Sequence, residues 1–169
     1  MLFRSREALE RQTATAEILK VISSSPTDVQ PVFDAIAESG LRLFQGAAVG
    51  VLRAEGDEIH AAAIAERDPE RAARWRARWP TPLTREYMHG AAILDCRMID
   101  VPDALAVGDE FEVGIKNFTP SGYRAITIVP LVKSGAAIGA ISVVRIAPGP
   151  LTDKQIALLH TFAEDRKST

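Results

Sequence analysis

The residues with the most recognisable chemistry in this sequence are one cysteine and three histidines. Cys96 could act as a nucleophile, as an attachment point for a bilin, or as an ordinary half-buried thiol. His60, His89 and His160 lack the close spacing of a metal-binding pair, so no metal site is predicted. A single imidazole such as His89 could ligate haem iron, or could lie at a surface or pocket wall.

Recognisable catalytic patterns are not found in the sequence. It contains no glycine-rich phosphate loop, no Gly-x-Ser-x-Gly and no His-Glu-x-x-His. The acids Asp100 and Asp103 flank Pro102, where forming a turn is the simpler role. We therefore predict no catalytic residues, and we do not expect this stretch of sequence to be an enzyme.

Aromatic residues gather in one long segment of mixed character, residues 66–123. They are Trp75, Trp79, Tyr87, Phe111, Phe118 and Tyr123. Aromatic walls with a few polar groups form small-molecule pockets, but aromatic residues also pack irregular segments onto a sheet. Both interpretations stay open. Insertions of this length in compact domains commonly bind ligands or cover sites, so function is expected here.

The composition indicates which binding partners and which cell compartment to expect. The net charge of -2, with basic residues spread along the chain, favours neither nucleic acid nor an anionic membrane. A single cysteine and an N-terminus without a signal-peptide pattern favour a reducing, cytoplasmic setting. No apolar run reaches the roughly 20 residues of a membrane-spanning helix, so direct membrane insertion is not expected.

The segment that must position these residues is an apolar hairpin near the C-terminal end. Its predicted arms are Ala125–Val132 and Ile138–Val144, and Ser134-Gly135 can supply the positive φ of a short turn. Neither arm alternates cleanly between apolar and polar residues, so both faces should be covered and the hairpin should be central. Pro130 lacks an amide donor, which predicts a bulge or an unpaired edge there.

The remaining pattern predicts an α+β fold. A second helix should begin near Thr27 or Asp28 and end at Gly46, a second hairpin should follow over 47–65, and Thr152 should cap the last helix. Within the insertion we predict helices after Asp68, over 84–92 and over 111–117, and a short strand over 98–101. The order indicates an antiparallel β-sheet with helices packed on one face and the helix and loop insertion over the other.

Residues 1–24 are predicted to form an N-terminal helix, separate from a sensor-like domain over residues 25–169. An apolar stripe on this helix is formed by Leu9, Ala16, Leu19 and Ile22. The stripe suits a coiled-coil seam, which would make the protein a homodimer, or a solvated helix lying on the domain.

Several short motifs, in order, resemble the GAF domain. They are MIDVPD at 98–103, GYRAITIVPLV at 122–132, GAAIGAISVVR at 135–145 and LTDKQIALL at 151–159. The opening TATAEILKVISSSPTDVQPVFDAI at 13–36 looks like GAF domains of bacterial sensor histidine kinases. The resemblance implies a regulatory domain that binds a small ligand or a partner and relays a conformational change to an output module. It leaves open a ligand-free dimerisation or spacer module.

The resemblance does not identify a cofactor. Similar domains bind cyclic nucleotides, haem, bilins or metabolites, but the family's Asn-Lys-Phe-Asp-Glu set for cyclic nucleotides is not recognisable here. Arg97 follows Cys96 where bilin-binding members usually have histidine, and a GAF-fold sulfoxide reductase would need several cysteines. The full-length protein is expected to be a histidine kinase, while this fragment is not expected to be catalytic.

The predicted ligand site lies between the central hairpin and the segment from Tyr87 to Phe118. Its wall is predicted to include four side chains of that segment: Tyr87, His89, Phe111 and Phe118. Asp103 or Arg124 would supply the polar contact that orients the ligand. Residues 104–118 would form a lid over the site, with fast backbone exchange in the ligand-free protein.

Overall fold

The computed structural model describes residues 30–44 and 47–163. The strands are β1 (Ala47–Glu55), β2 (Glu58–Ala65), β3 (Thr81–Pro82), β4 (Ile99–Val101), β5 (Ala125–Lys133) and β6 (Ala136–Arg145). The helices are α2 (Gln30–Leu43), α3 (Pro69–Arg76), α4 (Met88–Asp95), α5 (Glu112–Phe118), the 3-10 helix η1 (Thr119–Ser121) and α6 (Asp153–Ala163).

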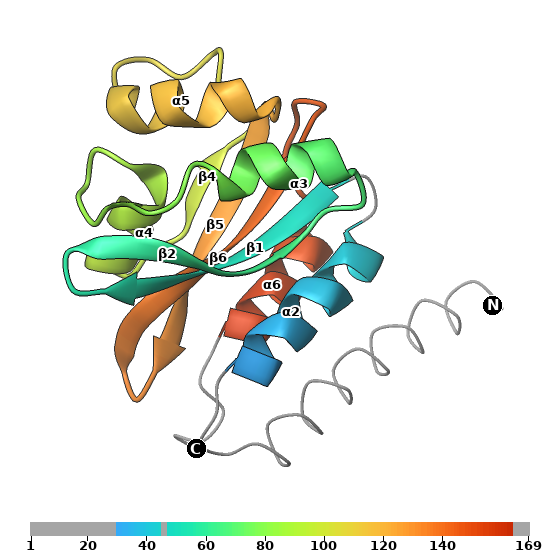
Figure 1. Ribbon diagram of the computed structural model, residues 1–169, viewed down its shortest axis with the longest axis vertical. Helices are drawn as coiled ribbons and strands as arrows, with labels where there is room; N and C mark the ends of the chain where they lie inside the picture. Colours follow the sequence, from blue (N-terminus) through green and yellow to red (C-terminus); the bar gives the residue numbers. More distant parts are fainter. Residues whose placement is uncertain (1–29, 45–46, 164–169) are drawn as a thin grey trace, which may run out of the picture.

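The strands of the described residues form one antiparallel sheet in the order β3-β2-β1-β6-β5-β4. Helices α2 and α6 cover one face, while α3, α4 and α5 lie over the other (Figure 1). This arrangement confirms the predicted fold class. The chain therefore has two apolar cores, one on each side of a single sheet.

The predicted central hairpin is formed by β5 and β6. Its turn uses Ser134 at φ 54° and Gly135 at φ 79°, the positive values that a two-residue hairpin turn requires. Ile126 and Ile128 of β5 are buried in the core beneath α3, α4 and α5, whereas Val129 and Leu131 are buried in the core beneath α2 and α6. The prediction that both faces of this hairpin are covered is confirmed.

The irregularity predicted at Pro130 is also present. The pairing of β5 with β6 shifts register between Leu131 and Val132, directly after the proline. On the opposite edge, β4 pairs only with Ile126 to Ile128. Pro130 therefore lies beyond the reach of β4, which needs no amide from it.

Helices α2 and α6 form their core from the predicted apolar residues. Phe33, Ile36 and Ala37 of α2 are buried against the sheet together with Leu159 and Phe162 of α6. The predicted end of the second helix at Gly46 was wrong, because α2 ends at Leu43.

The predicted N-cap of the last helix is confirmed. The Gln155 amide donates to Thr152 Oγ1 at 3.1 Å, and the Thr152 amide donates to Gln155 Oε1 at 2.9 Å. This reciprocal pair is a capping box, which satisfies two backbone donors at the start of α6.

The insertion contains the predicted helices with shifted boundaries. The helix predicted over 84–92 begins later, at Met88, because residues 84–87 form a turn in which the Tyr87 amide donates to the Thr84 carbonyl at 3.3 Å. The short strand β3 was not predicted, since Pro80 and Pro82 favoured a simple stop. Pro82 is tolerated because β3 lies at the edge of the sheet.

The predicted N-terminal helix, its seam and the boundary at residue 24 lie outside the described residues. Among the helices over 30–44 and 47–163, none combines the length and apolar character needed to cross a bilayer.

Candidate functional site

The face of the sheet beneath α3, α4 and α5 carries a core that is rich in aromatic residues. Trp75, Phe118 and Tyr123 are each at most 2% exposed and pack over Ile126 and Ile128 of β5. The rings of Trp75 and Tyr123 meet edge to face at 5.5 Å, and those of Phe118 and Tyr123 stack at 6.4 Å. The insertion is thus a packed layer into which polar side chains have been placed.

Helix α3 and the turn after it place an arginine and a second tryptophan in this layer. Asp68 caps the helix by accepting from the amides of Glu70 and Arg71 at 2.9 and 3.4 Å. The helical turn continues past Arg76, whose carbonyl accepts from the Trp79 amide at 3.2 Å. Trp75, Arg78 and Trp79 are spaced i, i+3 and i+4, so they share one face of this turn.

Arg78 is held between two aromatic rings. Its guanidinium carbon lies 5.1 Å from the centre of the Trp79 ring and 5.2 Å from that of Phe118. Its Nε donates to Asn117 Oδ1 of α5 at 2.7 Å. Burial lowers the pKa of Arg78 to about 10, so the side chain keeps its positive charge at neutral pH.

Helix α4 brings a neutral histidine to the same place. His89 is 2% exposed and meets the Trp79 ring edge to face at 4.9 Å. Burial first, and then the nearby Arg78 charge, hold the pKa of His89 well below its usual range of about 6.5. The imidazole is therefore uncharged near pH 7 and can accept or donate one hydrogen bond at each nitrogen as its tautomer dictates.

These residues form what we call the Arg78 cluster: Arg78, Trp79, His89 and Phe118. Each of its polar side chains has a buried nitrogen with no hydrogen-bond partner among the described residues, namely Arg78 Nη1, Trp79 Nε1 and His89 Nε2. Leaving such a group buried and unpaired costs about 1 to 3 kcal/mol each. Three such nitrogens in one cluster indicate a place where a group with hydrogen-bond acceptor atoms could bind.

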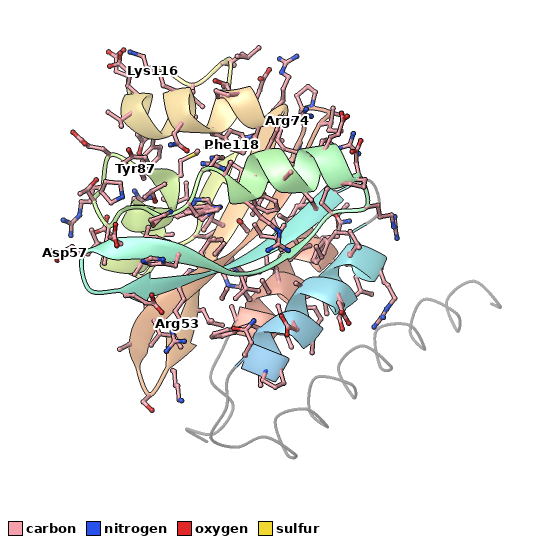
Figure 2. The ribbon with its side chains drawn as sticks, in the orientation of Figure 1. Arg53, Asp57, Arg74, Tyr87, Lys116 and Phe118 are labelled. Carbon is pink, nitrogen blue, oxygen red and sulfur yellow. The ribbon has the colours of Figure 1, made fainter. Side chains whose placement is uncertain are left out.

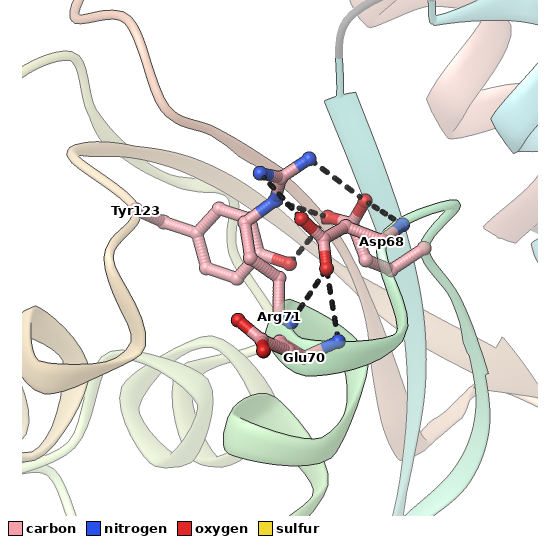
Figure 3. Close-up of polar contacts among 5 residues, drawn as sticks. Asp68, Glu70, Arg71 and Tyr123 are labelled. Atoms are coloured by element: carbon pink, nitrogen blue, oxygen red, sulfur yellow. Dashed lines mark hydrogen bonds and ion pairs between the residues drawn. The ribbon is translucent and has the colours of Figure 1, made fainter.

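A neighbouring polar network contrasts with the Arg78 cluster. Tyr123 donates its hydroxyl to Glu66 Oε2 at 2.6 Å, and Arg71 Nε lies 3.4 Å from the same oxygen (Figure 3). Arg71 Nη1 pairs with Asp68 Oδ2 at 3.1 Å. Burial and the bond to Glu66 raise the pKa of Tyr123. The acids and the arginine in this network are paired with one another, so it holds α3 on the sheet and needs no ligand.

Three of the predicted site residues lie around Arg78. His89 and Phe118 belong to the cluster, and the Tyr87 phenol is close enough to favour the charged form of Arg78. Figure 2 shows Tyr87 and Phe118 on the side of the sheet covered by the insertion. Phe111 precedes α5 with φ 60° and packs, partly buried, on the same core.

The two predicted polar contacts, Asp103 and Arg124, bind each other. Arg124 Nη2 lies 2.8 Å from Asp103 Oδ2 and 2.9 Å from Oδ1. The Arg124 carbonyl also accepts from the Ala104 amide at 2.6 Å. In this conformation the pair anchors the start of the 104–118 segment, and no described contact connects it to the Arg78 cluster.

The functional residues missing from the sequence prediction are Arg78 and Trp79. The signal was present as Trp75-Arg-Ala-Arg78-Trp79, in which an arginine lies beside one tryptophan and one helical turn from another. The segment was predicted only as a short basic helix carrying both tryptophans, and none of its four arginines, at 71, 74, 76 and 78, was singled out. Arg74 and Arg76 are exposed, whereas Arg71 and Arg78 are partly buried. The bond from Arg78 to Asn117 of α5 depends on the tertiary fold.

The other chemically distinctive residues lie apart from the cluster. Cys96 is exposed at the C-terminal end of α4, where it adopts φ 48°, so the half-buried thiol interpretation was wrong. His60 lies beside Glu58 on the hairpin of β1 and β2, and His160 is on α6. Within the described part of the chain, histidine, cysteine and acidic side chains form no group of three that could hold a metal ion.

Comparisons with solved structures agree with this architecture. The GAF domain of an Acinetobacter phosphoenolpyruvate-protein phosphotransferase has a TM-score of 0.69 and 11% identity, covering 94% of this chain and 88% of that one. A methyl-accepting chemotaxis protein, residues 122 to 287, has a TM-score of 0.67 and 19% identity, covering 89% and 90%. A free methionine-R-sulfoxide reductase from Neisseria meningitidis, in complex with its substrate, has a TM-score of 0.68 and 20% identity, covering 94% and 86%.

At these identities the structural likeness shows a shared fold. No curated protein matches the sequence. The family described as GAF domain, however, matches residues 28–165, which is most of the chain. The chain therefore belongs to the GAF domain family, a family of regulatory and sensory domains in signal-transduction proteins.

Proposed function

We propose that this GAF domain is the sensory module of a bacterial sensor histidine kinase, binding a small molecule beneath α3, α4 and α5 and relaying its presence to an output module. The observation that carries the proposal is the set of three unpaired buried nitrogens in the Arg78 cluster. Native interiors rarely keep such groups without a functional reason. A ligand that accepts hydrogen bonds would satisfy them.

The surroundings of the cluster suit a small organic ligand. The rings of Trp79 and Phe118 offer apolar contact, while the arginine and histidine offer directed polar contact. Small-molecule sites typically combine mainly apolar walls with a few polar groups in this way.

Access to the cluster would come through movement of residues 104–118. Leu105 is 68% exposed, and the segment 105–110 contributes little to the core. At its far end, the Gly114 amide donates to the Glu86 carbonyl at 3.0 Å, which ties α5 to the turn before α4. A segment held mainly at its ends can open locally at low free-energy cost.

The central hairpin offers a route for the relay. Ile126 and Ile128 of β5 contact the core beneath the insertion, while Val129 and Leu131 of the same strand contact the core of α2 and α6. A shift of β5 on ligand binding would therefore be felt by α6, the last described helix. Strand β5 therefore connects the proposed site on one side of the sheet to α2 and α6 on the other.

The alternative is a ligand-free dimerisation or spacer module. It is favoured by the dense packing of the same face, where Trp75 and Phe118 are both 0% exposed. In either case we expect a cytoplasmic homodimer without nucleic-acid partners and without catalytic activity in this fragment. The exposed Cys96, remote from the Arg78 cluster in the contacts described, does not support an enzymatic role for the site.

Hydrogen exchange of the full chain, with and without the small-molecule fraction of a bacterial extract, tests the sensory function. We expect amides over 104–118 to exchange fast in the ligand-free protein and to slow with the fraction, because a bound ligand would hold the segment closed. The amides of β1 serve as an internal control and should not change. Uniformly slow exchange over 104–118 without any added fraction would support the spacer instead.

A further inference from the structure

We propose that the ligand of the Arg78 cluster is an organic anion whose carboxylate or phosphoryl oxygens pair with the Arg78 guanidinium. The inference rests on the small-molecule function proposed above and names its ligand class. It follows from the charge of Arg78, from the donors that surround it and from a comparison with Arg145, another largely buried arginine among the described residues.

The charge of Arg78 is not compensated within the described structure. Its one hydrogen-bonded partner is the neutral amide of Asn117, and its Nη1 is buried without a partner. The groups that favour its charged form are the phenols of Tyr87 and Tyr123, and no carboxylate is among them. The rings of Trp79 and Phe118 stabilise the cation but supply no counter-charge. Buried charges in proteins are characteristically paired, so an anion is the group that would compensate Arg78.

The unpaired groups near Arg78 are hydrogen-bond donors or can become donors. Guanidinium and indole nitrogens only donate, and a neutral imidazole donates from one of its two nitrogens. Trp79 Nε1 and His89 Nε2 are therefore suited to oxygens that also contact Arg78. Carboxylate and phosphoryl groups accept several hydrogen bonds, and the planar guanidinium fork matches both.

Arg145 shows how this fold buries an arginine for structural reasons. Its guanidinium donates to Thr127 Oγ1 at 3.1 Å and to the carbonyls of Val143 and Gly149 at 3.0 and 2.8 Å. These bonds tie the loop after β6 to the sheet. Arg145 Nε is itself buried without a partner, but both terminal nitrogens of Arg145 are bonded. Arg78 is bonded only at Nε, so its terminal nitrogens, the fork that receives an anion, have no hydrogen-bond partner among the described residues.

The two tryptophans of the chain give a direct readout. In a nitrogen-proton correlation spectrum of the full chain, Trp75 and Trp79 each give one indole signal, which a Trp79→Phe variant assigns. We would titrate benzoate and phenyl phosphate as anionic probes and benzamide as a neutral probe of the same shape as benzoate. We expect the Trp79 signal to shift with at least one anion, and benzamide to bind at least roughly tenfold more weakly.

Arg78→Met tests the residue, and Arg76→Met is the matched control because Arg76 is exposed at the end of α3, two residues before Arg78. We expect Arg78→Met to weaken anion binding at least roughly tenfold. We also expect it to melt no lower than wild type without ligand, because an unpaired buried charge is removed. Arg76→Met should bind as wild type does. If Arg78→Met does not fold, Arg78→Lys keeps the charge without the fork and should bind with intermediate affinity.

The outcomes separate this inference from the function on which it rests. Benzamide binding as tightly as both anions would overturn the anionic ligand while leaving a small-molecule site in place. A markedly lower melting temperature of Arg78→Met, with anion affinity unchanged, would make Arg78 structural. If neither anion moves the indole signals and the extract slows no amides over 104–118, both proposals fail.

Discussion

The buried imidazole of His89 predicts that this domain loses stability as the pH falls below neutrality. His89 is 2% exposed, and burial together with the Arg78 charge depresses its pKa in the folded protein. In the unfolded chain the same imidazole titrates near 6.5. Below that pH the unfolded state binds a proton that the folded state refuses, so folding becomes less favourable.

As long as the imidazole stays neutral in the folded protein, the size of the stability loss depends only on the pKa of His89 in the unfolded chain. Full stability is present above about pH 6.5, and each further pH unit downwards costs about 1.4 kcal/mol for one proton. Between about pH 7.5 and about pH 5.5 the loss should be about 1.4 kcal/mol. For a domain of this size that corresponds to a fall in Tm of about 3 to 6 °C.

Urea denaturation of wild type and His89→Gln at these two pH values measures the effect. The variant has no titratable side chain at position 89. Its free energy of unfolding should therefore fall by about 1.4 kcal/mol less than that of wild type between the two pH values. His60→Gln, at a partly exposed histidine on the hairpin of β1 and β2, is the matched control and should follow wild type. Equal losses in wild type and His89→Gln would refute the assignment of a buried neutral imidazole.

Three further predictions concern the fold and its assembly. Ile128→Ala or Ile141→Ala, each at a side chain that is 0% exposed, should cost about 2 to 5 kcal/mol in denaturant unfolding, and a change near zero would make the hairpin peripheral. Gly90→Ala should cost at least about 1 to 3 kcal/mol, because its Cβ would clash with the Thr84 carbonyl oxygen; wild-type stability would mean that α4 is not docked on this turn. A chain beginning at Ser25 should sediment as a monomer at concentrations where the full chain is dimeric, and equal masses would remove the seam of Leu9, Ala16, Leu19 and Ile22 from the interface.

The sheet and the helical face were predictable because they rest on local signals. Ser134-Gly135 favours a tight turn, and the apolar strands on either side of it must be buried on both faces. Thr152 and Gln155 form a capping box, and the two residue types at a spacing of three can be recognised in the sequence. In each case one physical requirement acts between residues that are close in sequence.

The site was only partly predictable because its contacts are not local. Asn117 fixes Arg78 from 39 residues away, and His89 reaches the same tryptophan from another helix. No pattern along the chain shows which arginine of a basic helix will be buried by a later segment. Asp103 and Arg124 illustrate the reverse, since both were read as available to a ligand and the fold pairs them with each other.

Native mass spectrometry of the full chain, incubated with the small-molecule fraction of a bacterial extract, tests the sensory role most directly. We expect one additional non-covalent mass per chain for wild type and for Arg76→Met, and its loss from Arg78→Met. The same unliganded mass for all three proteins, whatever fraction is added, would contradict a ligand site at the Arg78 cluster.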